Sequence, residues 1–365
     1  MGFRMGIVGL PNVGKSTLFN ALTRTAAAQA ANFPFCTIEP NVGEVAVPDP
    51  RLDKLAAIAG SKQIIPTRMT FVDIAGLVRG ASKGEGLGNQ FLANIRECDA
   101  IAHVLRCFED GDITHVEGRI DPVADAETIE TELMLADLES IERRRANLAR
   151  KLKGGDKESA DQDRLLALAQ VALNDGKPAR SVQVAADDLK QWRMLQLLTA
   201  KPVLYVCNVE ESKAAEGNSQ SARVAEMAAK IGAASVVISA KIEEEISQLP
   251  EDEAAMFLEE MGLHEAGLDR LIRAGYQLLG LQTYFTVGPK EARAWTITKG
   301  TLAPAAAGVI HGDFEKGFIR AETVAYDDYI AGKGEAGAKE AGKFRVEGKT
   351  YEVQDGDVLH FLFNG

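Results

Sequence analysis

Residues 9–17 read Gly9-Leu10-Pro11-Asn12-Val13-Gly14-Lys15-Ser16-Thr17 and fit G-x-x-x-x-G-K-[ST], the pattern of a phosphate-binding loop. The apolar segment from Phe3 to Val8 precedes this run and a plausible helix start follows it, so the motif has the strand–loop–helix context that it requires. We expect backbone N–H groups of the loop and the positive end of the helix to face phosphate oxygens. Lys15 would reach the β- and γ-phosphates, and the Ser16 hydroxyl would bind Mg²⁺.

Composition limits the class of protein. The chain has 365 residues, of which 46% are hydrophobic and 26% charged, enough for two or three globular domains. No apolar run reaches the ~20 residues of a membrane span, and the first strand begins at once, so we expect no membrane segment and no signal peptide. The four cysteines form no C-x-x-C pair, which argues against zinc or disulfides and favours a reducing cytoplasm. The net charge of −12 argues against a protein that coats nucleic acid, but leaves room for one basic face.

A second motif, Asp73-Ile74-Ala75-Gly76, follows the segment Ile64 to Val72, which reads as a strand, as does Gly43 to Val47. An acidic residue at the carboxyl end of a parallel strand lies at the ligand edge of the sheet. Asp73 would support Mg²⁺ through water, and the N–H of Gly76 would meet the γ-phosphate. The D-x-x-G pattern alone is a weak indication of a nucleotide site. It becomes more specific when it follows a phosphate-loop motif and lies at the end of its own strand.

Two segments suit a nucleotide switch. Residues 23–40 read as a loop that contains Thr37, whose hydroxyl would add a second Mg²⁺ ligand; an ordinary turn threonine has roughly equal odds by position alone. The glycine-rich segment Gly76 to Gly88 precedes a predicted helix, where a conformational switch is expected.

Leu77 occupies the place where Ras-type GTPases carry the glutamine that orients the attacking water. Leucine cannot form a hydrogen bond, so either hydrolysis is slow or another group positions the water. His115, in a polar loop after the strand Ala100 to Cys107, is our candidate, with a solvated loop histidine as the alternative. His103 alternates with apolar residues inside that strand and is interpreted as structural.

The base-reading motifs depart from the guanine pattern. A strand over Val203 to Cys207 ends in Asn208-Val209-Glu210-Glu211, and another over Val236 to Ile238 ends in Ser239-Ala240-Lys241, where GTPases carry N-K-x-D and S-A-K. Val209 replaces the lysine, and Glu211 carries one methylene more than aspartate, which displaces its carboxylate by roughly an ångström or more. Asn208 can still hold the loop together and bind a purine. The sequence therefore predicts relaxed or adenine-favouring specificity.

The remaining chain predicts further helices and a small second domain. Helical spacing from Asp125 to Leu152 and from Ser159 to Leu173, with Gly154-Gly155 between, predicts a helical hairpin. Its cations could meet RNA phosphates or form a solvated face, with equal weight: Arg143, Arg144, Arg145, Arg150, Lys151, Lys153 and Lys157. Other segments read as helices at 187–199, 251–261, 268–279 and 314–319, strands at 294–298 and 358–363, and a loop at 333–343.

Taken together, these motifs resemble the YchF family of ribosome-associated ATPases, within the Obg group of P-loop proteins, over essentially the whole length. The C-terminal part resembles a TGS domain, a ubiquitin-like β-grasp module, through Gly300-Thr301, Pro304, Ala306-Ala307, Ile310-His311 and Gly356-Asp357-Val358.

The resemblance implies an α/β P-loop fold with a Ras-like, mostly parallel sheet at 1–124 and 196–281. It implies a helical coiled-coil insertion at 125–195 and an α+β TGS domain at 282–365. It also implies Mg²⁺-dependent hydrolysis of ATP in preference to GTP, and binding of the ribosome and its large subunit through the TGS and helical parts. A histidine can replace the missing glutamine in this family, which favours His115. We expect a monomer, because nothing demands a dimer.

Two alternatives compete. A conventional Obg-type GTPase is disfavoured by Asn208 to Glu211. An RNA-binding or ribosome-binding adaptor with weak nucleotide turnover is disfavoured by the intact Lys15, Ser16 and Asp73.

Overall fold

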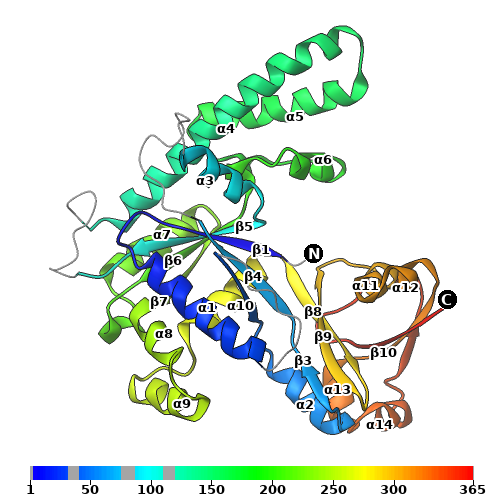
Figure 1. The fold of residues 1–365 in the computed structure, drawn as a ribbon. Helices are drawn as coiled ribbons and strands as arrows, with labels where there is room; N and C mark the ends of the chain where they lie inside the picture. Colours follow the sequence, from blue (N-terminus) through cyan, green and yellow to red (C-terminus); the bar gives the residue numbers. More distant parts are fainter. Residues whose placement is uncertain (1–2, 32–40, 75–86, 110–119, 365) are drawn as a thin grey trace. The chain divides into compact units, whose positions relative to one another are not determined.

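The computed structural model describes residues 3–31, 41–74, 87–109 and 120–364 and divides the chain into two compact units (Figure 1). Unit 1 comprises residues 1–45 and 70–275, and unit 2 comprises residues 46–69 and 276–365. The expected assignment of residues 46–69 to the nucleotide domain does not match these units, because that segment packs within unit 2. Each helix in the described part of the chain is too short or too polar to cross a membrane.

The sheet of unit 1 has the strand order β2-β4-β1-β5-β6-β7, and β4, β1, β5, β6 and β7 run parallel. The strands span Arg4–Val8 (β1), Val42–Ala46 (β2), Arg68–Asp73 (β4), Ala100–Arg106 (β5), Val203–Asn208 (β6) and Ala234–Ile238 (β7). All residues of β5 and β6 are buried, as parallel strands covered on both faces should be. The predicted P-loop α/β fold is confirmed. The strand order reverses at β1, because β4 lies on one side of β1 and β5 on the other. In such sheets the ligand binds beyond the carboxyl end of the strand at which the order reverses.

Besides the hairpin and a short helix between 189 and 194, the described α-helices of unit 1 are α1 (Lys15–Ala31), α3 (Leu87–Arg96), α7 (Ser219–Lys230), α8 (Ala240–Ile246), α9 (Glu251–Glu260) and α10 (Gly267–Leu278). Helix α1 packs against α8. The predicted loop over residues 23–40 is wrong for its first part, since α1 continues to Ala31. Residues 25–31 are rich in alanine, which has the highest intrinsic helix propensity.

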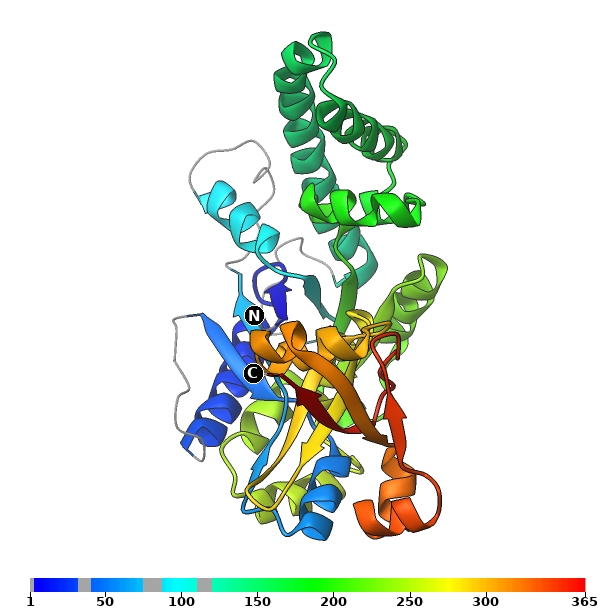
Figure 2. The same cartoon turned by 90° about the vertical axis from the view of Figure 1, so that its right-hand side faces the viewer.

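Two long helices, α4 (Pro122–Lys153) and α5 (Lys157–Asn174), form the predicted hairpin and lie side by side in both views (Figures 1 and 2). Asp121 and Asp156 cap their first turns. The single helix predicted over 187–199 is wrong. The chain there forms a 3₁₀ turn at 186–188, α6 (Leu189–Met194) and a second 3₁₀ turn at 198–200. Gln196 adopts φ = 50°, a left-handed conformation that an α-helix cannot continue through.

Unit 2 is built on a mixed sheet with the order β11-β10-β12-β8-β9-β3. Its strands are β3 (Gln63–Ile65), β8 (Leu281–Val287), β9 (Glu291–Thr298), β10 (Phe318–Val324), β11 (Arg345–Glu347) and β12 (Val358–Phe363). Its helices are α2 (Pro50–Ala59), α11 (Ala303–Ile310), α12 (Gly312–Lys316), α13 (Tyr326–Ala331) and α14 (Glu335–Glu340). Helix α14 lies where a loop was predicted, and the helix predicted over 314–319 gives way to β10 at Phe318.

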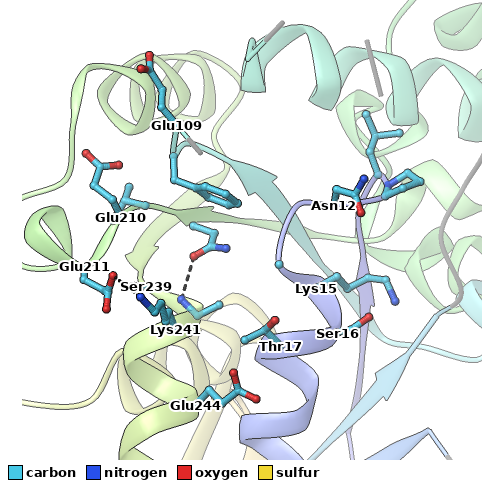
Figure 3. A pocket seen from close by; sticks show the side chains of 17 residues that line it. Asn12, Lys15, Ser16, Thr17, Glu109, Glu210, Glu211, Ser239, Lys241 and Glu244 are labelled. Carbon is cyan, nitrogen blue, oxygen red and sulfur yellow. Dashed lines mark hydrogen bonds and ion pairs between the residues drawn. The ribbon is translucent and has the colours of Figure 1, made fainter. Parts of the chain in front are cut away.

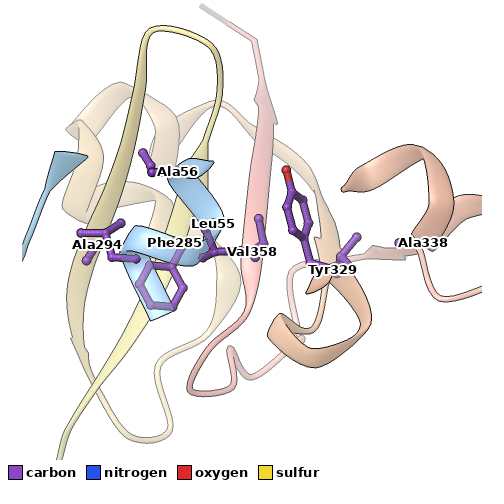
Figure 4. Close-up of a cluster of buried hydrophobic side chains, with 10 residues drawn as sticks. Leu55, Ala56, Phe285, Ala294, Tyr329, Ala338 and Val358 are labelled. Atoms are coloured by element: carbon purple, nitrogen blue, oxygen red, sulfur yellow. The ribbon is translucent and has the colours of Figure 1, made fainter. Parts of the chain in front are cut away.

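The strand predicted over 64–72 is two strands in different sheets. Strand β3 pairs parallel with β9 in unit 2, whereas β4 pairs with β1 in unit 1. Pro66 separates them, and proline cannot donate to a strand ladder. Leu55 and Ala56 of α2 join Phe285, Ala294 and other residues in the buried core of unit 2 (Figure 4).

Candidate nucleotide-binding site

One cavity of about 1050 Å³ lies in unit 1 at the carboxyl ends of β1, β5, β6 and β7. Its lining consists of Leu10, Pro11, Asn12, Gly14, Lys15, Ser16, Thr17, Phe108, Glu109, Asn208, Val209, Glu210, Glu211, Ser239, Ala240, Lys241 and Glu244. Asn12, Lys15 and Ser16 lie on one side, and Glu210, Glu211 and Lys241 lie on the other (Figure 3). The phosphate-loop motif and the base-side motifs, almost 200 residues apart in the sequence, therefore meet around one space.

The loop after β1 takes a backbone conformation that depends on two residues with positive φ. Asn12 has φ = 63° and Gly14 has φ = 90°. The Gly14 carbonyl accepts a hydrogen bond from Leu18 N at 3.0 Å, so α1 begins directly from the loop. Lys15 and Ser16 therefore stand in the first helical turn, where backbone N–H groups are free of intrahelical partners and favour anions.

The Lys15 ammonium contacts the Asp73 carboxylate, which joins the two predicted phosphate and metal motifs. Both side chains are largely buried, with 11% and 20% of their surface exposed. The Asp73 backbone is held by β1 and β4 and by a hydrogen bond from its N–H to Asn41 O of 2.8 Å. The Ser16 hydroxyl and Asp73 carboxylate are hard oxygen donors of the kind that Mg²⁺ prefers.

Asn208 is buried and uses both ends of its side-chain amide. Its Nδ2 donates to Val13 O at 2.9 Å, and its Oδ1 accepts from Ala240 N at 2.9 Å. The expectation that Asn208 holds the loops together is confirmed. Val13 itself is buried and contributes its carbonyl to this contact rather than a surface to the cavity.

The base-side residues do not present the chemistry of a guanine clamp. Val209 is 2% exposed, and its N–H donates to Ile238 O at 2.8 Å, so an apolar side chain occupies the usual lysine position. The Glu211 carboxylate forms an ion pair with Lys241 at 3.0 Å. The pair uses only Glu211 Oε2 and lies between two exposed side chains, so it competes with a guanine for this carboxylate without blocking it.

Seven lining residues were not singled out as binding residues from the sequence: Leu10, Pro11, Phe108, Glu109, Glu210, Lys241 and Glu244. The Arg106 guanidinium lies over the Phe108 ring, 4.6 Å from its centroid, and holds this aromatic residue at the cavity. Phe108 and Glu109 follow β5, so the rule that ligands bind beyond the carboxyl ends of parallel strands would have found them. Lys241 and Glu210 lay inside the quoted motifs, and Glu244 is one helical turn further along α8.

Thr37, Gly76, Leu77 and His115 lie outside the described residues, so their expected roles stay predictions. His103 is described. It is buried in β5, and its ring centroid lies 5.8 Å from that of Tyr205. Burial, with a smaller contribution from the charge of Arg180, lowers the pKa of His103 to about 3. The interpretation of His103 as a structural residue is confirmed.

Comparisons with known proteins agree over the full length. A family model described as "50S ribosome-binding GTPase" matches residues 4–136, and a model named for the C-terminal part of YchF GTPases, of unknown function, matches residues 281–364. Proteins named "Ribosome-binding ATPase YchF" from Pasteurella multocida and Bacillus subtilis are 59% and 56% identical, with 100% of both chains covered. The structure of the Schizosaccharomyces pombe YchF GTPase is 37% identical, with a TM-score of 0.88, and covers 99% of this chain and 98% of its own.

Proposed function

This chain belongs to the YchF family, and from that premise we propose that it is a Mg²⁺-dependent ATPase that binds the ribosome. The observation that carries the proposal is the single cavity in which a complete phosphate loop faces a base side without a guanine clamp. Its curated relatives are named ATPases, whereas the yeast structure and the N-terminal family model carry the name GTPase. These names therefore differ in the base of the nucleotide.

The base side favours ATP over GTP through Val209 and Glu211. Guanine recognition needs a carboxylate that accepts two hydrogen bonds, and the Glu211 carboxylate stands one methylene further out than that of aspartate and bonds Lys241. Phe108 offers a stacking surface that either purine can use, so it contributes affinity and not the choice of base.

Catalysis would consist of positioning and charge neutralisation. Lys15 and the loop N–H groups would stabilise charge on the phosphates, while Ser16, Thr37 and, through water, Asp73 would hold Mg²⁺. The metal ion, when bound, neutralises negative charge that develops on the phosphate oxygens. Gly76 would contact the γ-phosphate, and His115 would orient the attacking water.

The tip of the helical hairpin is the surface that we propose for ribosomal RNA. Three of the seven hairpin cations are engaged within the protein: Arg143 by Glu139, Arg145 by Asp163, and Arg144 by the carbonyl of Leu195. The other four, Arg150, Lys151, Lys153 and Lys157, are exposed around the turn at residues 154–155. A compact group of exposed cations on a protein of net charge −12 suits a phosphate backbone. Ribosome binding would place the protein in the cytoplasm.

Unit 2 supports the proposed TGS module. Strands β8 and β12, the first and last of its C-terminal part, pair in parallel, with Val358 opposite Phe285. We propose that unit 2 adds a second contact to the large subunit.

Two measurements test the function. In competition binding, ATP should displace a labelled nucleotide at lower concentration than GTP, and clearly tighter GTP binding would establish the conventional GTPase instead. In ribosome co-sedimentation with ATP, ADP or no nucleotide, Lys151→Glu/Lys153→Glu should reduce pelleting. The matched control, Lys177→Glu/Lys230→Glu, changes the net charge equally at exposed positions away from the tip and should pellet like the wild type. Ribosome binding without measurable hydrolysis would favour the adaptor.

A further inference from the structure

Asn218, which precedes α7, uses its side chain in two directions. Its Oδ1 accepts from the N–H groups of Gln220 and Ser221, each at 3.0 Å, and so caps the helix. Its Nδ2 points the other way and donates to Cys107 O at 2.6 Å and to Glu210 Oε2 at 3.1 Å. The cap is a general device of helices, whereas the second pair of bonds reaches two loops at the nucleotide cavity.

The local backbone fixes Asn218 in this orientation. Gly217 has φ = 78°, and a Cβ at that position would lie 2.5 Å from Ser221 Oγ, so a side chain there would disturb the cap. The Asn218 N–H donates back to Ser221 Oγ at 2.8 Å, which completes a reciprocal capping box. The amide of Asn218 therefore has no freedom to leave the two loops without breaking the start of α7.

The two loops that Asn218 joins carry base-side residues of the cavity. Cys107 is followed by Phe108 and Glu109, and Glu210 stands between Val209 and Glu211; apart from Cys107, all of these line the cavity. The Cys107 N–H also donates to Asn208 O at 2.8 Å, so the ends of β5 and β6 are connected on both sides of the Cys107 peptide unit. None of these contacts involves the phosphate loop directly.

We propose that Asn218 is a positioning residue for recognition of the base. By holding the Cys107 carbonyl and the Glu210 carboxylate, it sets the distance between the Phe108 surface and the loop after β6. The inference rests on the proposed nucleotide-binding function. Asn218 does not line the cavity, but it would fix the arrangement of the base-side loops that do. An amide suits both tasks, because its acceptor and its two N–H donors are on separate atoms that point in different directions.

The side-chain chemistry supplies a discriminating variant. Asn218→Asp keeps an N-cap acceptor of equal quality for Gln220 and Ser221. It removes the donor to Cys107 and places a second carboxylate beside Glu210, so the two loops lose the link that Asn218 makes, while the bond from the Cys107 N–H to Asn208 O remains. Ser221→Ala is the matched control, since it breaks the capping box but leaves the Asn218 Nδ2 bonds in place.

The experiment compares two ligands of the full-length protein, ATP and base-free tripolyphosphate, by displacement of a fluorescent nucleotide. Asn218→Asp should weaken ATP binding by about 5- to 30-fold, the range expected for loss of one or two positioning hydrogen bonds. Tripolyphosphate binding should change by less than about twofold, because the phosphate loop is held by Asn208 instead. Ser221→Ala should leave the ratio of the two affinities at its wild-type value, even where it lowers the unfolding temperature.

If Asn218→Asp weakened the binding of ATP and of tripolyphosphate equally, Asn218 would only stabilise the protein in general, and the proposal would be overturned. Unchanged ATP binding in a variant whose circular dichroism and unfolding temperature match those of the wild type would also overturn it. A wild-type protein that binds no ATP would contradict the proposed function itself, which separates the two failures.

Discussion

Asn208 Nδ2 lies 2.2 Å from the point that a Cβ on Gly14 would occupy. The two residues are 194 positions apart by their numbers, and they meet because the loop after β1 and the end of β6 lie at the same edge of the sheet, with β5 between the two strands. The same amide nitrogen donates to Val13 O, so the phosphate loop and the base-side loops share one buried hydrogen-bonded contact. A change that displaces the Asn208 side chain is therefore expected to disturb both segments.

Gly14→Ala should weaken nucleotide binding and lower the free energy of unfolding by about 1–3 kcal/mol, because the new methyl group displaces Asn208 and φ = 90° strains any L residue. Gly60→Ala is the control: Gly60 also has positive φ, at 63°, but no atom lies within 4 Å of its added Cβ. ATP titration and urea unfolding of both variants measure the effects. Equal ATP affinity in the two variants would show that the close approach of Gly14 to Asn208 does not affect nucleotide binding.

Glu211→Asp should shift the base preference toward GTP. Removing a methylene draws the carboxylate away from Lys241 and toward the position that reads guanine, so the ratio of GTP to ATP affinity should rise by about threefold or more. Glu211→Gln, which has no charge but keeps the length, should not raise that ratio. The test is competition binding with both nucleotides, and a ratio that falls in Glu211→Asp would contradict the geometry inferred for Glu211.

His115→Ala should slow ATP turnover by about tenfold or more, a typical loss for a residue that positions a reacting group, and leave ATP affinity nearly intact. Single-turnover hydrolysis and equilibrium binding separate the two effects. An unchanged rate constant would show that His115 does not position the attacking water. Another residue, or a group of the ribosome, would then have to do so.

His103 should make folding stability depend on pH. Its pKa in the folded protein is about 3, below the ~6.5 of an unfolded chain, so the unfolded state takes up more protons as the pH falls below about 6.5. The contribution of neutral His103 to stability is therefore present at pH 7 and declines toward pH 3. Between pH 7 and pH 4.5, the free energy of unfolding should therefore fall by about 2–3 kcal/mol less in His103→Phe than in the wild type. Urea unfolding of both proteins at both pH values measures this, and an equal loss of stability in the variant and the wild type would contradict the role given to His103.

A fragment of residues 276–365 alone should not fold cooperatively. Leu52, Leu55 and Ala56 of α2 are buried with Phe285 and other side chains of that segment, and β3 completes the sheet beside β9. Joining residues 46–69 to 276–365 through a short flexible linker should restore a cooperative thermal transition. Leu55→Asp in the joined fragment should abolish it again, since a buried carboxylate without a partner costs several kcal/mol. A cooperative transition in residues 276–365 alone would contradict this account.

Much of the site could be predicted from local patterns. The phosphate loop, the position of Asp73 and the departures at Val209 and Glu211 are visible because each depends on residue type at fixed spacing beside a predicted strand. Phe108 and Asn218 belong to no such motif, although the position of Phe108 after β5 was a signal that the sequence offered. Phe108 matters because β5 ends at the ligand edge, and Asn218 matters because a helix cap happens to face two loops that are distant in the sequence.

The sequence by itself determined the fold class, the phosphate-binding chemistry and the helical hairpin, because short-range periodicity and turn-forming residues specify them locally. Tertiary structure alone decided that residues 46–69 belong to unit 2, that Lys241 engages Glu211, and that Asn208 excludes any side chain at Gly14. Those three facts depend on contacts between segments from 30 to more than 200 residues apart, and such contacts form only when the strand order of each sheet brings the segments together.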